Sequence, residues 1–281
     1  ANQNYKKVSD PSLTVIFPAE FTGKFVSDEY HPNQNIHINV LVWTTTPWTL
    51  PSNMLLCLHP DLEYAVVQHK KHLYFLLESR VKSYFKKDYK VINKVIGKDC
   101  IGIEYIPLFR FYENFKPANP DSHQFRIVAD TMVSAETGTG IVHIAPGFGQ
   151  EDKDVSDKYG LTSDTVLPPC PLDDKCHFTE PVTSLKFLKD RFCKDCDKDI
   201  IKHLKAYGRI FKYESITHEY PYCYRTDCPL IYRTCDAHFI KVKEHKERIK
   251  ANLLKTNWVP RYVRDNKYMQ ALDSCVDWCI S

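Results

Sequence analysis

The sequence predicts an α+β fold in which a β-barrel-like core carries peripheral helices and is followed by a C-terminal helical connector. Three observations predict this class. Short apolar runs rich in β-branched residues recur through the first two-thirds of the chain, polar turns separate them, and helical periodicity appears only later. Because 43% of the 281 residues are hydrophobic, the chain can bury a core, and global disorder is excluded.

Six segments are expected to form strands, because each is a short apolar run bounded by polar or Pro- and Gly-containing turns. They are residues 39–44, 63–67, 73–77, 89–95, 127–129 and 141–145. Regular short strands of this kind are typical of a barrel or a sandwich.

Three segments are expected to form helices. Residues 151–159 carry acids in the first turn and are followed by Gly160, which suits a helix end. Residues 195–207 place isoleucines and a leucine at helical spacing before Gly208. Residues 237–254 combine an apolar face with a Lys/Glu face.

Residues 1–215 are expected to form the β-rich domain with short helices, and residues 216–281 the connector.

The composition excludes several classes of function. The net charge of +3 excludes a strongly basic nucleic-acid binder. No GxGxxG or GxxxxGK[ST] motif is present, and no apolar run approaches the length of a membrane span. Eleven cysteines without a secretory signal are read as reduced thiols of a cytoplasmic protein.

The first segment with chemical character is WTTTPWTLPSN, residues 43–53. Pro47 keeps Thr46 out of the helical region, so the strand ends there and three threonine hydroxyls gather at one rim. Each hydroxyl can donate one hydrogen bond and accept two, which suits a ribose, a carbonyl or a water. The alternative is a threonine-rich strand end whose hydroxyls cap the turn.

The second segment is GTGIVHIAPGFGQED, residues 138–152. A strand containing His143 is bracketed by glycines, which allow close approach of a ligand to the backbone, and Asp152 follows at the start of a helix. His143 alone could be a structural histidine, and Asp152 alone a helix N-terminal residue.

Together the two segments, about a hundred residues apart, resemble the editing domain of the isoleucyl-tRNA synthetases, the connective peptide 1 insertion, of the eukaryotic cytosolic type. Valyl and leucyl relatives usually carry TTRP, and Thr46 occupies that arginine position, which favours the isoleucyl branch. The resemblance covers most of the chain, including YPYCYRTDCPLIYRT as part of the connector toward the class I catalytic domain. HIGH- and KMSKS-type signatures for ATP are absent from the sequence, so aminoacylation is not expected of it.

The resemblance implies hydrolysis of mischarged valyl-tRNA(Ile), with valyl-adenylate as a second candidate substrate. Asp152 matches the acid that binds the substrate ammonium, and His143 matches the histidine whose bulk would obstruct isoleucine. The threonines would contact the terminal adenosine and orient a water. The implied catalytic residues are Thr45, Thr46 and Asp152, and the implied substrate-binding residues are Thr44, Trp48, Gly138, Thr139, Gly140, His143, Ala145 and Asp152. Phe148 departs from bacterial relatives, which often have a histidine there.

The implied partners are the acylated 3′ end of tRNA(Ile), valine or valyl-adenylate, and the parent catalytic domain, for a monomer with no membrane contact, no metal and no cofactor. Two alternatives remain. Cys193 and Cys196 form the single tight Cys-x-x-Cys pair, which a structural zinc module would need twice. The basic face of residues 241–255 could serve a non-catalytic tRNA-docking module.

Overall fold

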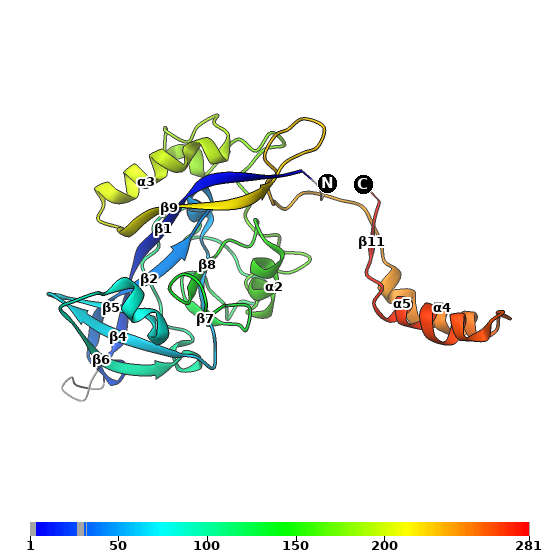
Figure 1. The fold of residues 1–281 in the computed structure, drawn as a ribbon, viewed down its shortest axis with the longest axis horizontal. Helices are drawn as coiled ribbons and strands as arrows, with labels where there is room; N and C mark the ends of the chain where they lie inside the picture. The colour runs from blue at the N-terminus through cyan, green and yellow to red at the C-terminus, as the bar shows by residue number, and fades with distance from the viewer. Residues whose placement is uncertain (1–3, 27–30, 32, 281) are drawn as a thin grey trace. The chain divides into compact units, whose positions relative to one another are not determined.

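The computed structural model describes residues 4–26, 31 and 33–280 (Figure 1). It divides into two compact units, Ala1–Thr234 and Cys235–Ser281. The strands are β1 (Tyr5–Thr22), β2 (Asn35–Thr44), β3 (Leu55–Leu58), β4 (Glu63–His69), β5 (His72–Leu77), β6 (Tyr89–Ile96), β7 (Ile127–Ala129), β8 (Ile141–Ile144), β9 (Ile210–Pro221), β10 (Phe239–Ile240) and β11 (Trp278–Cys279). The α-helices are α1 (Val81–Tyr84), α2 (Gln150–Lys158), α3 (Asp197–Ala206), α4 (Val242–Leu254) and α5 (Met269–Asp273).

Short 3₁₀ helices connect several of these elements. They are η1 (Gly23–Phe25), η2 (Pro47–Ser52), η3 (Glu78–Arg80), η4 (Gly97–Cys100), η5 (Val182–Ser184) and η6 (Cys193–Cys196). A π-helical segment, η7 (Val263–Tyr268), precedes α5.

The larger unit is built on a sheet whose described strands follow the order β6-β4-β5-β2-β1-β9. The long strand β1 pairs antiparallel with β2 and with β9. Leu13, Val15 and Phe17 lie on one face of β1 and are fully buried. Ser12 and Thr14 on the other face are also buried, so this part of the strand is covered on both faces. Figure 1 shows α3 running alongside β9.

A second, small sheet of the order β7-β3-β8 carries the strand with His143. Its central strand β3 pairs parallel with β7 and antiparallel with β8, and all four of its residues are buried. Because all four residues are buried, both faces of β3 are covered, and the run LLCL is continuously apolar rather than alternating.

The α+β class is confirmed, but the described strands form open sheets rather than a closed barrel. The reason is visible in the strand order: β6 and β9 lie at opposite edges of the large sheet, and β3, β7 and β8 pair only among themselves. The six strands expected from the sequence all form, with ends shifted by a few residues.

Two long strands, β1 and β9, were not expected from the sequence. Pro11 and Pro18 interrupt the pattern of β1, and β9 mixes charged with aromatic residues. The expected domain limit at residue 215 lies inside β9, whereas the compact units divide after Thr234. The role of the later residues as a connector stays a prediction.

The smaller unit contains α4, η7 and α5, together with the antiparallel pair β10 and β11. The helix expected at residues 237–254 begins later, at Val242, because Phe239–Ile240 pairs with Trp278–Cys279 instead. Among the residues that the structure describes, no helix is long and apolar enough to cross a membrane.

Candidate functional site

The threonine segment is a strand end that turns into a 3₁₀ helix. Thr44 is the last residue of β2, and Pro47 begins η2 with its fixed φ. The Thr46 hydroxyl lies 3.3 Å from the Thr44 hydroxyl and 3.1 Å from that of Thr49. The turn therefore gathers three hydroxyls into one hydrogen-bonded cluster.

His143 reaches this cluster from β8. Its Nε2 lies 3.1 Å from the Thr49 hydroxyl and 3.4 Å from the Thr44 hydroxyl. The side chain is buried, and burial lowers the pKa of His143 to about 4. The imidazole is therefore neutral at pH 7. Its Nδ1 is buried without a hydrogen-bond partner among the described residues, which leaves one ring nitrogen with unused bonding capacity.

Asp152 lies in the first turn of α2 and accepts a hydrogen bond from the backbone N–H of Ala145 at 2.8 Å. Burial raises the pKa of Asp152 to about 6, a shift that the Ala145 bond opposes and the neighbouring Glu151 adds to. Within the described residues, Asp152 forms no ion pair with a lysine or arginine, so its carboxylate charge is uncompensated.

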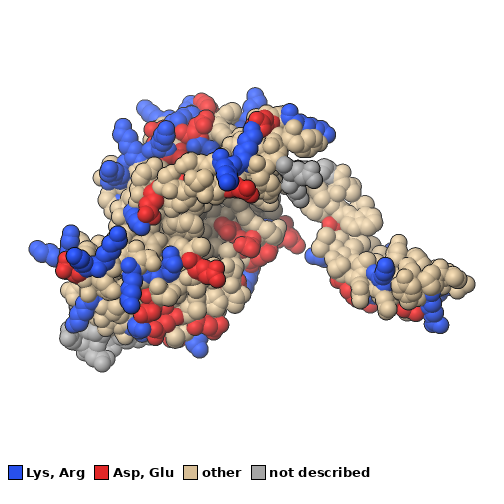
Figure 2. Space-filling view, in the orientation of Figure 1, with Lys and Arg blue, Asp and Glu red and all other residues tan. Residues whose placement is uncertain are grey.

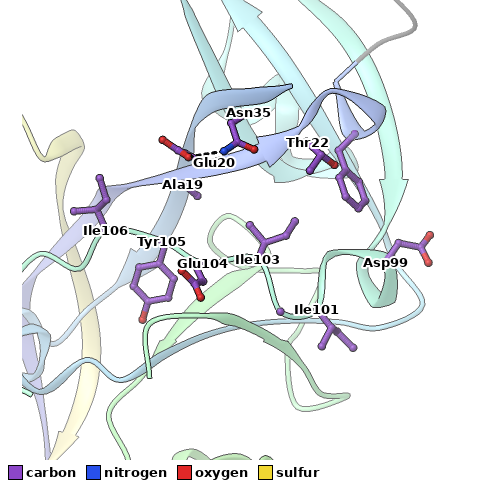
Figure 3. A pocket seen from close by; sticks show the side chains of 12 residues that line it. Ala19, Glu20, Thr22, Asn35, Asp99, Ile101, Ile103, Glu104, Tyr105 and Ile106 are labelled. Carbon is purple, nitrogen blue, oxygen red and sulfur yellow. Dashed lines mark hydrogen bonds between the residues drawn. The ribbon is translucent and has the colours of Figure 1, made fainter. Parts of the chain in front are cut away.

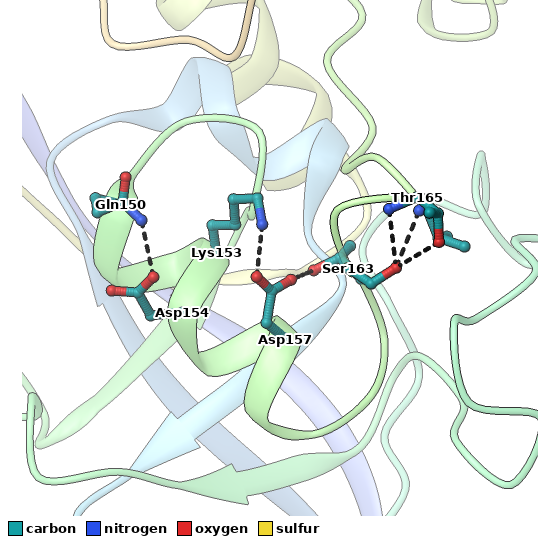
Figure 4. Close-up of polar contacts among 8 residues, drawn as sticks. Gln150, Lys153, Asp154, Asp157, Ser163 and Thr165 are labelled. Carbon is teal, nitrogen blue, oxygen red and sulfur yellow. Dashed lines mark hydrogen bonds and ion pairs between the residues drawn. The ribbon is translucent and has the colours of Figure 1, made fainter. Parts of the chain in front are cut away.

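The other two aspartates of α2 differ. Asp154 accepts a bond from Gln150 at 2.8 Å, and Asp157 pairs with Lys153 at 2.5 Å (Figure 4). These partners lie four residues away on the same helix, where side chains meet. Among the three aspartates of α2, Asp152 is therefore the one whose carboxylate has no side-chain partner in the described part of the chain.

A cavity of about 250 Å³ joins these groups. Its lining residues are Trp43, Thr44, Thr45, Thr46, Thr49, Val142, His143, Ala145, Phe148 and Asp152. We call it the threonine pocket. Figure 2 shows a hollow on this face of the larger unit with acidic side chains beside it, over α2. The cavity thus brings the two sequence segments together.

Four residues expected at the site do not line the pocket. Trp48 is 4% exposed and packs edge-on against Phe148, with ring centroids 5.2 Å apart, so it supports the wall from behind. Gly138, Thr139 and Gly140 lie outside the lining. Gly138 has a φ of +61°, and a Cβ there would come within 2.9 Å of the Trp43 side chain, so this glycine allows the pocket-lining Trp43 its position.

The pocket also contains residues that sequence reasoning did not assign to it. They are Trp43, Thr49, Val142 and Phe148. Thr49 and Trp43 lie within the WTTTPWT motif, so their proximity to the threonines was available as a signal. Contact between Thr49 and His143 depends on the pairing of β8 with β3, which the sequence does not reveal.

A second cavity, of about 630 Å³, lies elsewhere on the larger unit (Figure 3). Its lining residues are Ala19, Glu20, Thr22, Phe25, Asn35, Asp99, Ile101, Gly102, Ile103, Glu104, Tyr105 and Ile106. We call it the acidic hollow. It holds no residue of either sequence segment, so it is separate from the threonine pocket.

The two alternatives from the sequence find little structural basis. In residues 4–26, 31 and 33–280, no three His, Cys, Asp or Glu side chains are arranged to hold a metal ion. All eleven cysteines lie in the described residues and are free thiols. On the basic helix α4, Lys250 pairs with Glu247 and with Asp273, which reduces the positive charge that a phosphate would meet.

Comparison with known proteins decides the family. The model for tRNA synthetases class I (I, L, M and V) matches residues 3–281. The chain belongs to this family. Relatives that match this chain over its full length are isoleucine–tRNA ligases.

The cytoplasmic isoleucine–tRNA ligase of Schizosaccharomyces pombe is 37% identical over 287 residues, which cover 100% of this chain and 25% of that protein. The isoleucine–tRNA ligase of Bdellovibrio bacteriovorus is 39% identical over 286 residues, with the same two shares. The class I chain therefore spans about a quarter of the length of these relatives.

The solved structure GlLeuRS-CP1 shares the fold. It has a TM-score of 0.50 at 13% identity and covers 72% of this chain and 98% of that one. At this identity the likeness concerns the fold alone. The chain is thus a class I synthetase segment with the fold of a CP1 domain.

Proposed function

We propose that this chain hydrolyses mischarged valyl-tRNA(Ile) and thereby edits the product of an isoleucine–tRNA ligase. The observation that carries the proposal is the threonine pocket. Within one cavity it combines an uncompensated carboxylate, a neutral histidine and a hydroxyl cluster, drawn from β2, β8 and α2. Valyl-adenylate, which presents the same amino acid, is the second candidate substrate.

Asp152 recognises the α-ammonium of the aminoacyl group in this proposal. At pH 7 a carboxyl with a pKa of about 6 is roughly 90% ionised. The bound ammonium supplies the positive partner that the described residues do not provide, in a charge-assisted hydrogen bond. The Ala145 bond fixes the carboxylate beside the pocket.

His143 limits the length of the side chain that the pocket accepts. Its imidazole is fixed by two hydroxyls, and because it is neutral at pH 7 it does not repel the ammonium. One methylene changes binding by only about 1–3 kcal/mol, a general limit for which the isoleucyl-tRNA synthetases are themselves the standard example. A first pocket for isoleucine therefore admits valine, and a second, smaller pocket is needed to remove it.

The threonines orient the attacking water. A threonine hydroxyl is a poor nucleophile without a base, and His143 with a pKa of about 4 is a weak one. Thr45 and Thr46 are half-buried at the pocket and can hold a water by hydrogen bonds. The ester is then cleaved by water, and backbone N–H groups stabilise the oxyanion.

The names of the relatives support a location for this activity. Several matched ligases carry the name cytoplasmic, so we place the reaction in the cytoplasm. In a longer enzyme the catalytic domain would hold the body of the tRNA, and only the acylated 3′ end would enter the threonine pocket.

Deacylation of valyl-tRNA(Ile) and isoleucyl-tRNA(Ile), measured side by side, tests the proposal. The chain is assayed alone and within a longer ligase that contains it. Faster release of valine than of isoleucine is expected in at least one of the two. Equal rates for both amino acids, or no release of valine in either form, would refute the proposed function.

A further inference from the structure

The first turn of η2 is not capped by its own N-terminal residue. In a 3₁₀ helix each N–H bonds to the carbonyl three residues back, so the first donors lack partners. Pro47 has no N–H, and the N–H of Thr49 donates to the Thr46 carbonyl at 3.0 Å. The N–H of Trp48 is therefore the donor that needs an acceptor from elsewhere.

A threonine at the N-cap normally supplies that acceptor with its own hydroxyl. Thr46 occupies the N-cap position of η2 but makes no side-chain cap bond. Its hydroxyl instead faces Thr44 and Thr49, inside the threonine pocket. Something must therefore satisfy the Trp48 N–H without using the Thr46 hydroxyl.

Asp197, the first residue of α3, does so. Its Oδ1 accepts the Trp48 N–H at 3.0 Å, across 149 residues of sequence. The side chain is 8% exposed, so the bond is shielded from water. Lys194 partly compensates the buried charge, while Asp10 and Asp195 oppose it.

Lys194 is itself held in place beside this contact. Its Nζ lies 3.0 Å from Oδ2 of Asp10 and 4.0 Å from the centre of the Tyr220 ring. The same Asp10 oxygen lies 3.1 Å from Nε2 of His218. The carboxylate that caps η2 thus lies in the field of a polar cluster that joins η6 to β1 and β9.

We infer that Asp197 is a positioning residue for the proposed hydrolysis: by capping η2 from α3, it leaves the Thr46 hydroxyl free to work in the threonine pocket. The inference rests on the proposed function. Without the Asp197 acceptor, the Thr46 hydroxyl rotates to cap the Trp48 N–H and leaves the pocket. Asp197 therefore acts on the reaction through Thr46 and touches no substrate.

The test compares five variants of the chain for valyl-tRNA(Ile) hydrolysis. Asp197→Ala should lower kcat about tenfold, the size of a lost cap, with little change in KM. Asp197→Asn keeps an oxygen acceptor and should restore kcat to within about threefold of the original. Asp199→Ala is the matched control, because it removes an aspartate from the same turn of α3, one that pairs with Arg191, and should leave kcat unchanged.

The last two variants, Thr46→Val alone and Thr46→Val combined with Asp197→Ala, isolate the route through Thr46. In a Thr46→Val background, Asp197→Ala should lower kcat by less than about twofold further, since the hydroxyl that it positions is already gone. A full tenfold further loss would overturn the inference, and so would an equal loss in Asp197→Asn and Asp197→Ala.

Hydrogen exchange at the Trp48 amide separates this inference from the proposed function. The exchange should be faster in Asp197→Ala than in Asp199→Ala or the unchanged chain. If the unchanged chain released no amino acid but the amide behaved as expected, the proposed function would fail while the capping contact stood. Equal exchange in all of them would overturn the inference whatever the kinetics showed.

Discussion

The threonine pocket and the acidic hollow belong to the same unit, and they differ in whether their polar groups have bonding partners. The hollow is the larger, about 630 Å³ against about 250 Å³. Its carboxylates meet water or a neighbour: the Glu104 side chain is 76% exposed, and Glu20 accepts a bond from Asn35 (Figure 3). In the pocket, the Asp152 charge and the His143 Nδ1 are left without a partner among the described residues. Unused bonding capacity in a shielded place, rather than volume, is what marks a reactive site.

The strongest test of this contrast removes one charge from each cavity. Asp152→Asn should lower the kcat/KM of valyl-tRNA(Ile) hydrolysis by about 100-fold, because a charge-assisted bond to the ammonium is lost. Glu104→Gln in the acidic hollow should change it by less than about twofold. Kinetics of deacylation decide the matter, and a comparable loss in both variants would erase the distinction between the cavities.

The next effect concerns selectivity. His143→Ala should raise the rate of isoleucyl-tRNA(Ile) hydrolysis by about 10–100-fold, since the space for one more methylene opens. Ile106→Ala in the acidic hollow, at a residue that is 41% exposed, is the control and should not alter selectivity. The measurement is the ratio of the two hydrolysis rates. If the ratio survives in His143→Ala, another residue excludes isoleucine.

A smaller effect is expected from pH. The carboxylate form of Asp152 binds the ammonium, and the pKa of that group is raised to about 6. Below pH 6 the protonated fraction grows, so kcat/KM should fall toward tenfold lower at pH 5, about one decade per pH unit. Asp197 also titrates, with a pKa raised by burial to about 7, but its protonated form keeps a carbonyl oxygen that can accept the Trp48 N–H. An acid limb that persisted in Asp152→Asn would contradict the assignment.

The last effect is on stability and has the opposite sign to the effect on activity. The folded-state pKa of Asp152 lies above its ordinary value of 3.8, so ionisation between about pH 4 and pH 6 lowers the free energy of unfolding. At pH 7, Asp152→Asn should therefore raise that free energy by about 1–3 kcal/mol, or Tm by a few degrees. At pH 4 the two proteins should be equally stable. Thermal unfolding at both pH values gives the answer, and a destabilised variant at pH 7 would show that Asp152 serves the fold.

The short strands were predictable, whereas the frame that unites them was not. Strands such as β7 are short apolar runs with β-branched residues, and their length and composition distinguish them from buried helices. In contrast, β1 holds two prolines and many polar residues, and it is a strand because β2 and β9 pair along it. Pairing partners far apart in sequence leave no local signal.

The site shows the same division. The threonines, His143 and Asp152 were identified by their segments, and the structure places them around one cavity. Trp48 was expected among the substrate-binding residues, but it packs against Phe148 and does not line the pocket. No sequence motif points to Asp197. Its contact with Trp48 depends on the packing of α3 near η2.

The pairing of β1 with β9 has a consequence for the long segment that lies between them. In its register Tyr5 lies opposite Pro221, so the segment between these two residues begins and ends at one place. The residues between them form a long segment whose two ends are joined by the β1–β9 pairing. The length of this segment adds little to the entropic cost of joining its ends, because that cost grows only logarithmically with length. The segment between Tyr5 and Pro221 can therefore gain or lose surface residues at little entropic cost to this closure.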